Sequence, residues 1–191
     1  ETLLTATQYF SWAKLGKPYM GVGRNMAYKR EEFFRVRGFM DHMKIRSGDD
    51  DLFINQAANA VNTTICYSPD SFTFSKPKTT FGDWFRQKRR HVATAKHYKS
   101  FDRTQLAVFY LSQLTFFILP MILLAFQYQW IIVVSLIGFR YLTAWISMGF
   151  AAGKLKEKDV MYWFPIIEIV LILTQFNVFI TNIFSKPVQW K

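Results

Sequence analysis

The sequence of 191 residues has few groups that form disulfides or bind zinc. Its one cysteine, Cys66, excludes a disulfide within the chain, and its three histidines do not have the spacing of zinc ligands. The first residue is Glu1, with no initiator methionine, basic leader or short apolar signal core. We therefore expect a piece of a longer precursor whose polar part faces a reducing cytoplasm.

Charged side chains are missing from residues 104–139, although the whole chain has a net charge of +11. A helix needs roughly 20 apolar residues to cross a hydrocarbon core of about 30 Å, because its backbone polar groups must be satisfied internally. Three segments reach this length: 105–126, 130–150 and 160–184. We therefore predict a membrane region of about three helices in residues 104–191. A tight turn at 127–129 joins the first two, and Pro120 and Pro165 should kink or break their helices.

Lysines and arginines collect beside the predicted spans in two places, residues 86–103 and residues 154–158. Cytoplasmic loops carry such an excess, so we place both stretches in the cytoplasm. The turn at 127–129 and the C-terminal tail, residues 185–191, then lie on the far side. This pattern predicts a multi-pass integral membrane protein with a cytoplasmic polar domain, and we assign it to a bacterial inner membrane.

Two ionisable residues, Arg140 and Glu168, lie inside the predicted spans. An unpaired charge at that depth costs several kcal/mol, roughly 3 by insertion scales. The two residues lie at comparable depth when counted from the loop near Leu155, so we predict that they pair. The pair either holds two helices together or lines a path for a substrate.

Two short motifs in the polar part admit both a structural and a chemical interpretation. Gly21 and Gly23 predict a tight exposed turn, and the Arg24 and Asn25 that follow could contact a polar ligand. The spacing fits neither a dinucleotide-binding nor a phosphate-loop fingerprint. The acidic triplet 49–51 precedes a helix-like stretch, where carboxylates favour the helix start. Three adjacent carboxylates also repel one another, which indicates either a general base or a metal site.

Residues 81–91 have the pattern of an amphipathic helix lying at a membrane surface. Phe81, Trp84 and Phe85 fall on one side, and basic residues fill the rest. Contact with anionic lipid would account for the charge alone. Gln87 adds nothing to lipid binding, however, and its place beside two arginines suits a diphosphate, because arginine donates in pairs to phosphate oxygens.

The order of these features resembles the membrane-integrated family 2 glycosyltransferases, which include hyaluronan, chitin and cellulose synthases. Residues 47–50 (Ser-Gly-Asp-Asp) resemble the family's Gly-Glu/Asp-Asp base motif, and residues 87–91 (Gln-Lys-Arg-Arg-His) resemble its Gln-x-x-Arg-Trp motif. Residues 21–25 (Gly-Val-Gly-Arg-Asn) resemble its acceptor-side segment, and membrane spans follow as they do in the family.

The resemblance implies a fold and a domain order. Residues 1–80 would be the C-terminal part of an α/β, GT-A-like catalytic domain, residues 81–103 an interfacial segment, and residues 104–191 the membrane helices and tail. It also implies the reaction, an inverting transfer of a sugar from a nucleotide-diphosphate donor to a glycan or lipid-linked acceptor.

The resemblance further assigns roles to residues. Asp50 matches the catalytic base when Gly48 is aligned with the motif's glycine, and Asp49 takes that role when the alignment is made on Leu52; we assign the base to Asp50. The other assignments are Gln87, Arg89, Arg90 and His91 for the donor diphosphate and the acceptor end, and Gly23, Arg24 and Asn25 for the acceptor side. His91 stands where the family has tryptophan, which favours a short-glycan or lipid-linked acceptor over long-chain synthesis.

The family also uses a divalent ion, Mg²⁺ or Mn²⁺, held by an Asp-x-Asp motif in a nucleotide-binding half that these residues do not contain. We therefore predict no metal ligand in this chain and expect the chain alone to be inactive. Its predicted partners are a nucleotide-sugar, the acceptor and membrane lipid.

Two other function classes compete with the transferase. A transport or channel protein could use the acidic triplet and the intramembrane pair as an ion path, but three spans make a poor conduit. A membrane-tethered binder of an anionic ligand would explain the net charge of +11. We expect no nucleic-acid partner, because the basic residues lack aromatic platforms or a recognisable binding module.

Overall fold

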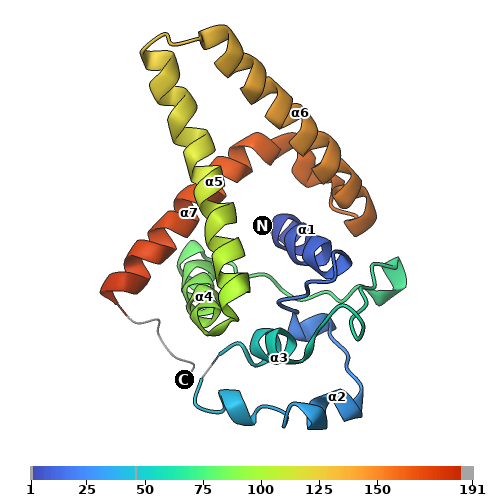
Figure 1. Ribbon diagram of the computed structural model, residues 1–191. Coiled ribbons are helices and arrows are strands. Elements are labelled where there is room, and N and C mark those ends of the chain that lie inside the picture. The colour runs from blue at the N-terminus through green and yellow to red at the C-terminus, as the bar shows by residue number, and fades with distance from the viewer. Residues whose placement is uncertain (1, 46, 186–191) are drawn as a thin grey trace. The chain divides into compact units, whose positions relative to one another are not determined.

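The computed structural model describes residues 2–45 and 47–185 (Figure 1). Contacts divide the chain into two compact units. Within the described residues, the first unit contains residues 2–7 and 104–174, and the second contains residues 8–45, 47–103 and 175–185. Three helices pass from one unit into the other: α1 (Thr2–Lys14), α5 (Ser100–Ala125) and α7 (Phe164–Phe184). Of the predicted far-side tail, residues 185–191, all but Ser185 lie outside the described residues.

Every regular element within the described ranges is a helix, so the α/β prediction is wrong for this chain. That prediction came from the family resemblance, whereas the local pattern of apolar residues is helical. In residues 2–80 the α-helices are α1, α2 (Arg30–Arg35) and α3 (Asp49–Ala57). Short 3₁₀ turns lie between and after them: Gly23–Asn25, Met40–His42 and Pro69–Ser71.

A small aromatic core joins α2 and α3 in the second unit. Phe53 is 1 % exposed and packs with Val36 and Ala57. Phe53 and Ala57 are four residues apart and so share a face of α3. Rings of Phe33 and Tyr28 contact Phe53 with centroids 6.0 and 4.6 Å away. This packing holds α3 in place through side chains that lie beyond its acidic N-terminal turn.

Asn55 connects α3 to the start of α5. Its side-chain amide donates to the Asp102 carboxylate at 2.8 Å and to the Tyr19 carbonyl at 3.0 Å. Its oxygen accepts from the Lys99 backbone N–H at 2.9 Å. Asn55 and Asp102 are both buried, so this polar cluster holds α3 and the beginning of α5 together within the second unit.

The predicted amphipathic helix is confirmed as α4 (Phe81–Thr94), followed by a 3₁₀ turn at Ala95–His97. The Thr80 hydroxyl caps it by accepting from the Asp83 N–H at 3.2 Å. The rings of Phe81, Trp84 and Phe85 lie together on one side, as the spacing predicted. Its position at a membrane surface stays a prediction.

Three helices are long and apolar enough to cross a membrane, consistent with a membrane protein: Ser100–Ala125, Trp130–Leu155 and Lys158–Phe184. The third consists of a 3₁₀ segment, η5 (Lys158–Trp163), and α7. The predicted tight turn is confirmed, with Gln127 and Gln129 at positive φ. Pro120 does not break α5, whereas Pro165 stands in the first turn of α7, where a missing N–H costs no intrahelical bond.

The predicted pair between Arg140 and Glu168 is confirmed in the first unit. Arg140 lies in α6 (Trp130–Leu155) and donates to both oxygens of Glu168 in α7, with Nη1 to Oε2 at 2.6 Å. Phe116 and Tyr141 place their rings 4.6 and 5.1 Å from the guanidinium carbon. Glu168 is only 3 % exposed, so the pair satisfies a charge that would otherwise be buried alone.

Candidate functional site

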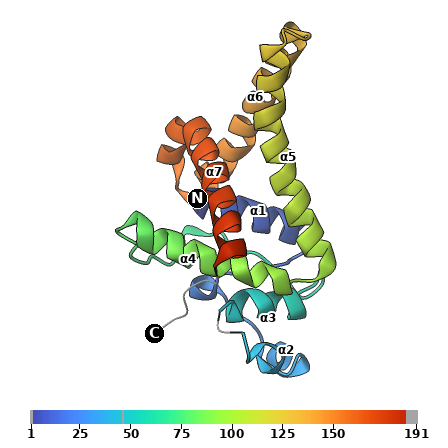
Figure 2. The same cartoon turned by 90° about the vertical axis from the view of Figure 1, so that its left-hand side faces the viewer.

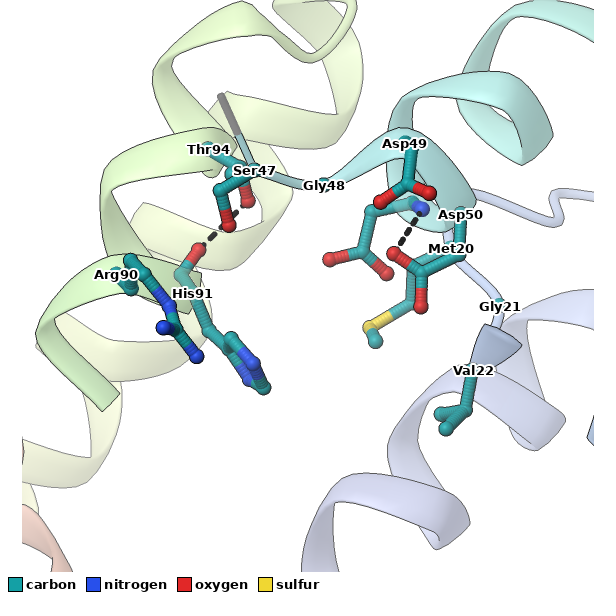
Figure 3. A pocket seen from close by; sticks show the side chains of 11 residues that line it. Met20, Gly21, Val22, Ser47, Gly48, Asp49, Asp50, Arg90, His91 and Thr94 are labelled. Atoms are coloured by element: carbon teal, nitrogen blue, oxygen red, sulfur yellow. Dashed lines mark hydrogen bonds between the residues drawn. The ribbon is translucent and has the colours of Figure 1, made fainter. Parts of the chain in front are cut away.

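Three parts of the second unit line one pocket of about 230 Å³. They are residues 20–22 after α1, residues 47–51 at the start of α3, and Arg90, His91 and Thr94 on α4. Figure 3 shows Arg90 and His91 across the pocket from Asp49 and Asp50. Residues of the two motifs that the sequence pointed to therefore lie on opposite walls of one cavity.

Gly48 brings the start of α3 against α4. Its φ is +81°, a left-handed conformation that favours glycine, and a Cβ built on it would lie 2.6 Å from Cγ2 of Thr94. Thr94 is 2 % exposed, and its hydroxyl donates to the His91 carbonyl at 2.7 Å. Only glycine fits between the two helices at this point, so Gly48 sets how closely the start of α3 approaches α4.

Asp50 is held by two backbone N–H groups. Its Oδ2 accepts from Gly23 at 2.7 Å, and its Oδ1 accepts from Asp51 at 3.0 Å. A Cβ on Gly23 would lie 3.0 Å from Oδ2, so this glycine serves the close approach of the loop to the carboxylate. Asp49 lines the same wall and is exposed. Of the two candidate bases, Asp50 has both oxygens engaged and Asp49 faces solvent.

Asp51 lies at the inner end of the acidic triplet. Burial, with the charges of Asp50 and Asp49, raises the pKa of Asp51 to about 7, and a hydrogen bond with Tyr98 opposes this rise. Burial and the nearby charge of Asp51 in turn raise the pKa of Tyr98. A proton on Asp51 relieves the repulsion among three adjacent carboxylates, so the triplet carries fewer than three charges at neutral pH.

The opposite wall comes from one face of α4. Positions 87, 90, 91 and 94 recur at three or four residues and so share a face of the helix. Arg90, His91 and Thr94 line the pocket, and Gln87 lies one turn earlier, outside its lining. Of the four residues predicted from this motif, Arg90 and His91 therefore line the pocket.

Arg89 lies elsewhere, because adjacent residues on a helix point in directions about 100° apart. Its Nε donates to the Asn182 side chain at 2.9 Å, and its Nη2 donates to the Ser185 carbonyl and hydroxyl at 2.6 and 2.7 Å. The Asn182 amide donates back to the Arg89 carbonyl at 3.1 Å. These contacts tie α4 to the C-terminal end of α7 within the second unit (Figure 2).

Arg24 and Asn25 also lie outside the pocket lining. Arg24 donates to the Ser75 hydroxyl, and the Asn25 amide donates to the Ser71 carbonyl at 2.9 Å. The Thr73 hydroxyl donates to the Arg24 carbonyl at 3.2 Å. Arg24 and Asn25 therefore bind residues 71–75, at the end of the third 3₁₀ turn and after it. Their neighbours at 20–22 line the pocket.

Within the described residues, no group of three or more His, Cys, Asp or Glu side chains is arranged to hold a metal ion. Asp49, Asp50 and Asp51 do not form such a group either, because they occupy consecutive positions in one turn of α3 and so point in different directions. The site as it stands therefore does not fit a divalent ion held by this chain alone.

Sequence reasoning missed several pocket residues. Thr94 follows Arg90 by four positions, so helical spacing alone could have placed it on the same face. Met20 carries no such signal, whereas Val22 and Ser47 belong to the quoted motifs but were given no role there. The contact of Asp51 with Tyr98 likewise spans distant parts of the sequence.

Comparison with known families yields a match that covers most of the chain. The profile described as "Glycosyl transferase family group 2" matches residues 2–175. Neither the curated proteins nor the solved structures provide a significant match. The matched range contains the pocket, both of its motifs and the greater part of the three apolar helices, and the chain therefore belongs to glycosyl transferase family group 2.

Proposed function

We propose that the pocket is the acceptor and diphosphate end of a glycosyl transfer site. The observation that carries this proposal is the pairing of carboxylates on α3 with Arg90 and His91 on α4 across one cavity. Sugar transfer from a nucleotide donor needs a carboxylate beside the attacking hydroxyl and a cation beside the leaving diphosphate. The family match supports the same general chemistry.

The proposed reaction is a direct displacement with inversion. A carboxylate of the triplet removes the proton from an acceptor hydroxyl, and the resulting oxygen attacks the anomeric carbon from the face opposite the diphosphate. The bond from that carbon to the diphosphate oxygen breaks, and the diphosphate leaves with the electron pair. Arg90 stabilises the developing negative charge, since guanidinium offers paired donors to phosphate oxygens.

We favour Asp49 over Asp50 as the base. Both oxygens of Asp50 accept backbone N–H groups, and these bonds join the loop at Gly23 to α3. Asp49 is exposed on the pocket wall, where an acceptor hydroxyl could reach it. Asp50 then has a positioning role: it holds the loop at Gly23 against α3. Its substitution would displace this loop in addition to removing a negative charge.

The remaining parts of the proposal concern the substrates and the cell. His91, across the pocket from the carboxylates, offers less stacking surface than tryptophan, which supports a short-glycan or lipid-linked acceptor. The Mg²⁺ or Mn²⁺ expected from the family would need ligands outside this chain, and no step of the proposed reaction uses it. Membrane lipid would surround the apolar helices, with the pocket on the cytoplasmic face of a bacterial inner membrane.

The transport interpretation receives less support. The intramembrane charges, Arg140 and Glu168, bind each other through two hydrogen bonds, and aromatic rings lie against the guanidinium. Such a pair has its charges compensated, which favours the interpretation that it holds α6 and α7 together.

The experiment compares single variants of the two carboxylates. Sugar transfer from a panel of nucleotide-sugars is measured in membranes that contain the protein at its full natural length. We expect Asp49→Asn to lower kcat by at least about 10²-fold with near-normal donor KM, as for loss of a general base. Near-normal turnover by both Asp49→Asn and Asp50→Asn would overturn the proposal. Loss in Asp50→Asn alone would transfer the role of base to Asp50.

A further inference from the structure

Arg89 binds the end of α7, although it lies inside a motif whose other members face the pocket. Its Nε donates to the side-chain oxygen of Asn182 at 2.9 Å, and the Asn182 amide donates back to the Arg89 carbonyl at 3.1 Å. One residue of α7 therefore holds both the side chain and the backbone of Arg89. The contact lies within the second unit, which contains all of α4 and the part of α7 from residue 175 onwards.

The same arginine also caps the C-terminal end of α7. Its Nη2 donates to the Ser185 carbonyl and hydroxyl at 2.6 and 2.7 Å, and the Ser185 hydroxyl donates to the Thr181 carbonyl at 3.1 Å. The last carbonyls of a helix have no intrahelical partner and form the negative end of its dipole, so a cation is favoured there. The last turn of α7 contains no basic residue of its own. The cation at this helix end therefore comes from α4.

The face of α7 that receives Arg89 is packed against protein. Val178, Asn182 and Ser185 recur at four and three residues and so share a face of the helix. Val178 is only 1 % exposed, whereas Ile183 and Phe184, which lie off this face, are exposed. Arg89 thus binds a helix side whose position is already set by packing.

The contact with α7 holds α4 on a different side from the contact with α3. Gly48 meets α4 at Thr94, five residues after Arg89. These two points are about 140° apart around the helix axis and about 7.5 Å apart along it. A helix held at two such points cannot turn about its axis without breaking one contact. Arg90 and His91 lie between them in the chain and line the pocket.

We propose that Arg89 and Asn182 are positioning residues, which direct Arg90 and His91 into the pocket by fixing α4 against the end of α7. The positioning role rests on the proposed function of the pocket. It replaces the role in diphosphate binding that the resemblance implied for Arg89, because the guanidinium is engaged by Asn182 and Ser185. Arg89 then acts on the donor through Arg90.

The contact itself is tested by a double-mutant cycle on thermal unfolding of the full-length protein in detergent. We expect Arg89→Gln and Asn182→Ala each to lower the unfolding temperature by roughly 2–4 °C. The double variant should lose less than the sum of these shifts, since both substitutions remove one contact. The control is Thr181→Val in the same turn, whose hydroxyl donates to the Asn177 carbonyl of its own helix and whose loss should have little effect. Additive shifts would overturn the inference.

The positioning role is tested by the kinetics of sugar transfer in two backgrounds. In the otherwise wild-type protein we expect Arg89→Gln and Asn182→Ala each to lower kcat/KM by about tenfold, because a displacement of about 1 Å near the reacting groups has effects of that size or larger. In an Arg90→Ala background the same substitutions should lower it by no more than about twofold, since the group that they position is gone.

Two kinetic results would overturn the positioning role. The first is an equal factor in both backgrounds, which a general loss of structure would produce. The second is a raised donor KM in Arg89→Gln that Asn182→Ala does not share, which direct binding of the diphosphate by Arg89 would produce. If these variants do not fold, Arg89→Lys and Ser185→Ala, which remove only part of the contact, replace them in the same comparison. An inactive wild type would refute the proposed function while leaving the unfolding cycle intact.

Discussion

The protonation of Asp51 gives the sharpest quantitative prediction. The pKa of its carboxyl is about 7, against an ordinary value of 3.8, chiefly because the side chain is buried. Each unit of pKa corresponds to about 1.4 kcal/mol, so the folded state holds this proton more tightly by about 4 kcal/mol. Between those two pH values the folded state binds the proton and the unfolded state does not. Stability should therefore fall as pH rises through this window and then level off.

Asp51→Asn removes this dependence, because the amide stays neutral and can still accept a hydrogen bond from Tyr98. At pH 4 the variant should be about as stable as the wild type, and at pH 8 it should be more stable by up to about 4 kcal/mol. The assay is thermal unfolding of the protein in detergent, followed by tryptophan fluorescence from pH 4 to 8. Asp49→Asn is the matched control, since it removes an exposed carboxylate of the same triplet and should preserve most of the slope. A slope in Asp51→Asn as steep as that of the wild type would refute the reasoning.

Three further substitutions test the framework around the pocket, each by thermal unfolding. Gly48→Ala should lower the free energy of unfolding by about 2–4 kcal/mol, because the new Cβ meets Thr94 and the φ of Gly48 is positive. The control is Gly82→Ala, whose new Cβ has nothing within 4 Å and which should leave the stability unchanged or slightly raised. Equal effects of the two substitutions would contradict the close packing of Gly48 against Thr94. Arg140→Gln and Glu168→Gln should each lower the free energy of unfolding by about 3–5 kcal/mol, because each leaves one buried charge without its partner. The double variant should lose less stability than the sum of the two single variants. Additive losses would mean that the two residues do not act as a pair. Asn55→Leu should lower the free energy of unfolding by about 2–3 kcal/mol, because the buried Asp102 carboxylate and the Lys99 backbone N–H lose a hydrogen-bond partner. An unchanged unfolding temperature would contradict the role of Asn55 in joining α3 to α5.

Local properties of the sequence predicted α3, α4 and the three apolar helices, but not α1 or α2. The apolar segments and α4 follow from hydropathy and from a spacing of three or four residues, which need no knowledge of distant contacts. The pairing of Arg140 with Glu168 was predictable because an unpaired charge in an apolar helix is costly. The wrong α/β prediction, in contrast, was carried over from a family fold and had no support in the periodicity of residues 2–80.

The sequence predicted which residues belong to the candidate site better than it predicted where their side chains point. Asp49, Asp50, Arg90 and His91 meet at one pocket, as the order of the motifs implied. The placement of Arg89 against Asn182 depends on how α7 ends, 93 positions further along the chain, and no local pattern records it. The burial of Asp51 beside Tyr98 depends in the same way on tertiary packing.

The central claim is that Arg90 holds the donor diphosphate in this pocket, beyond any general attraction of a basic helix to lipid. The most direct measurement compares the donor KM of Arg90→Ala with that of Lys88→Ala, which removes the same charge from α4 at a position outside the pocket lining. We predict that Arg90→Ala raises the donor KM by at least about tenfold, as expected when a charge-assisted phosphate contact is lost, while Lys88→Ala leaves it nearly unchanged. Equal changes in both variants would contradict the account and assign the charge of this helix to the membrane surface.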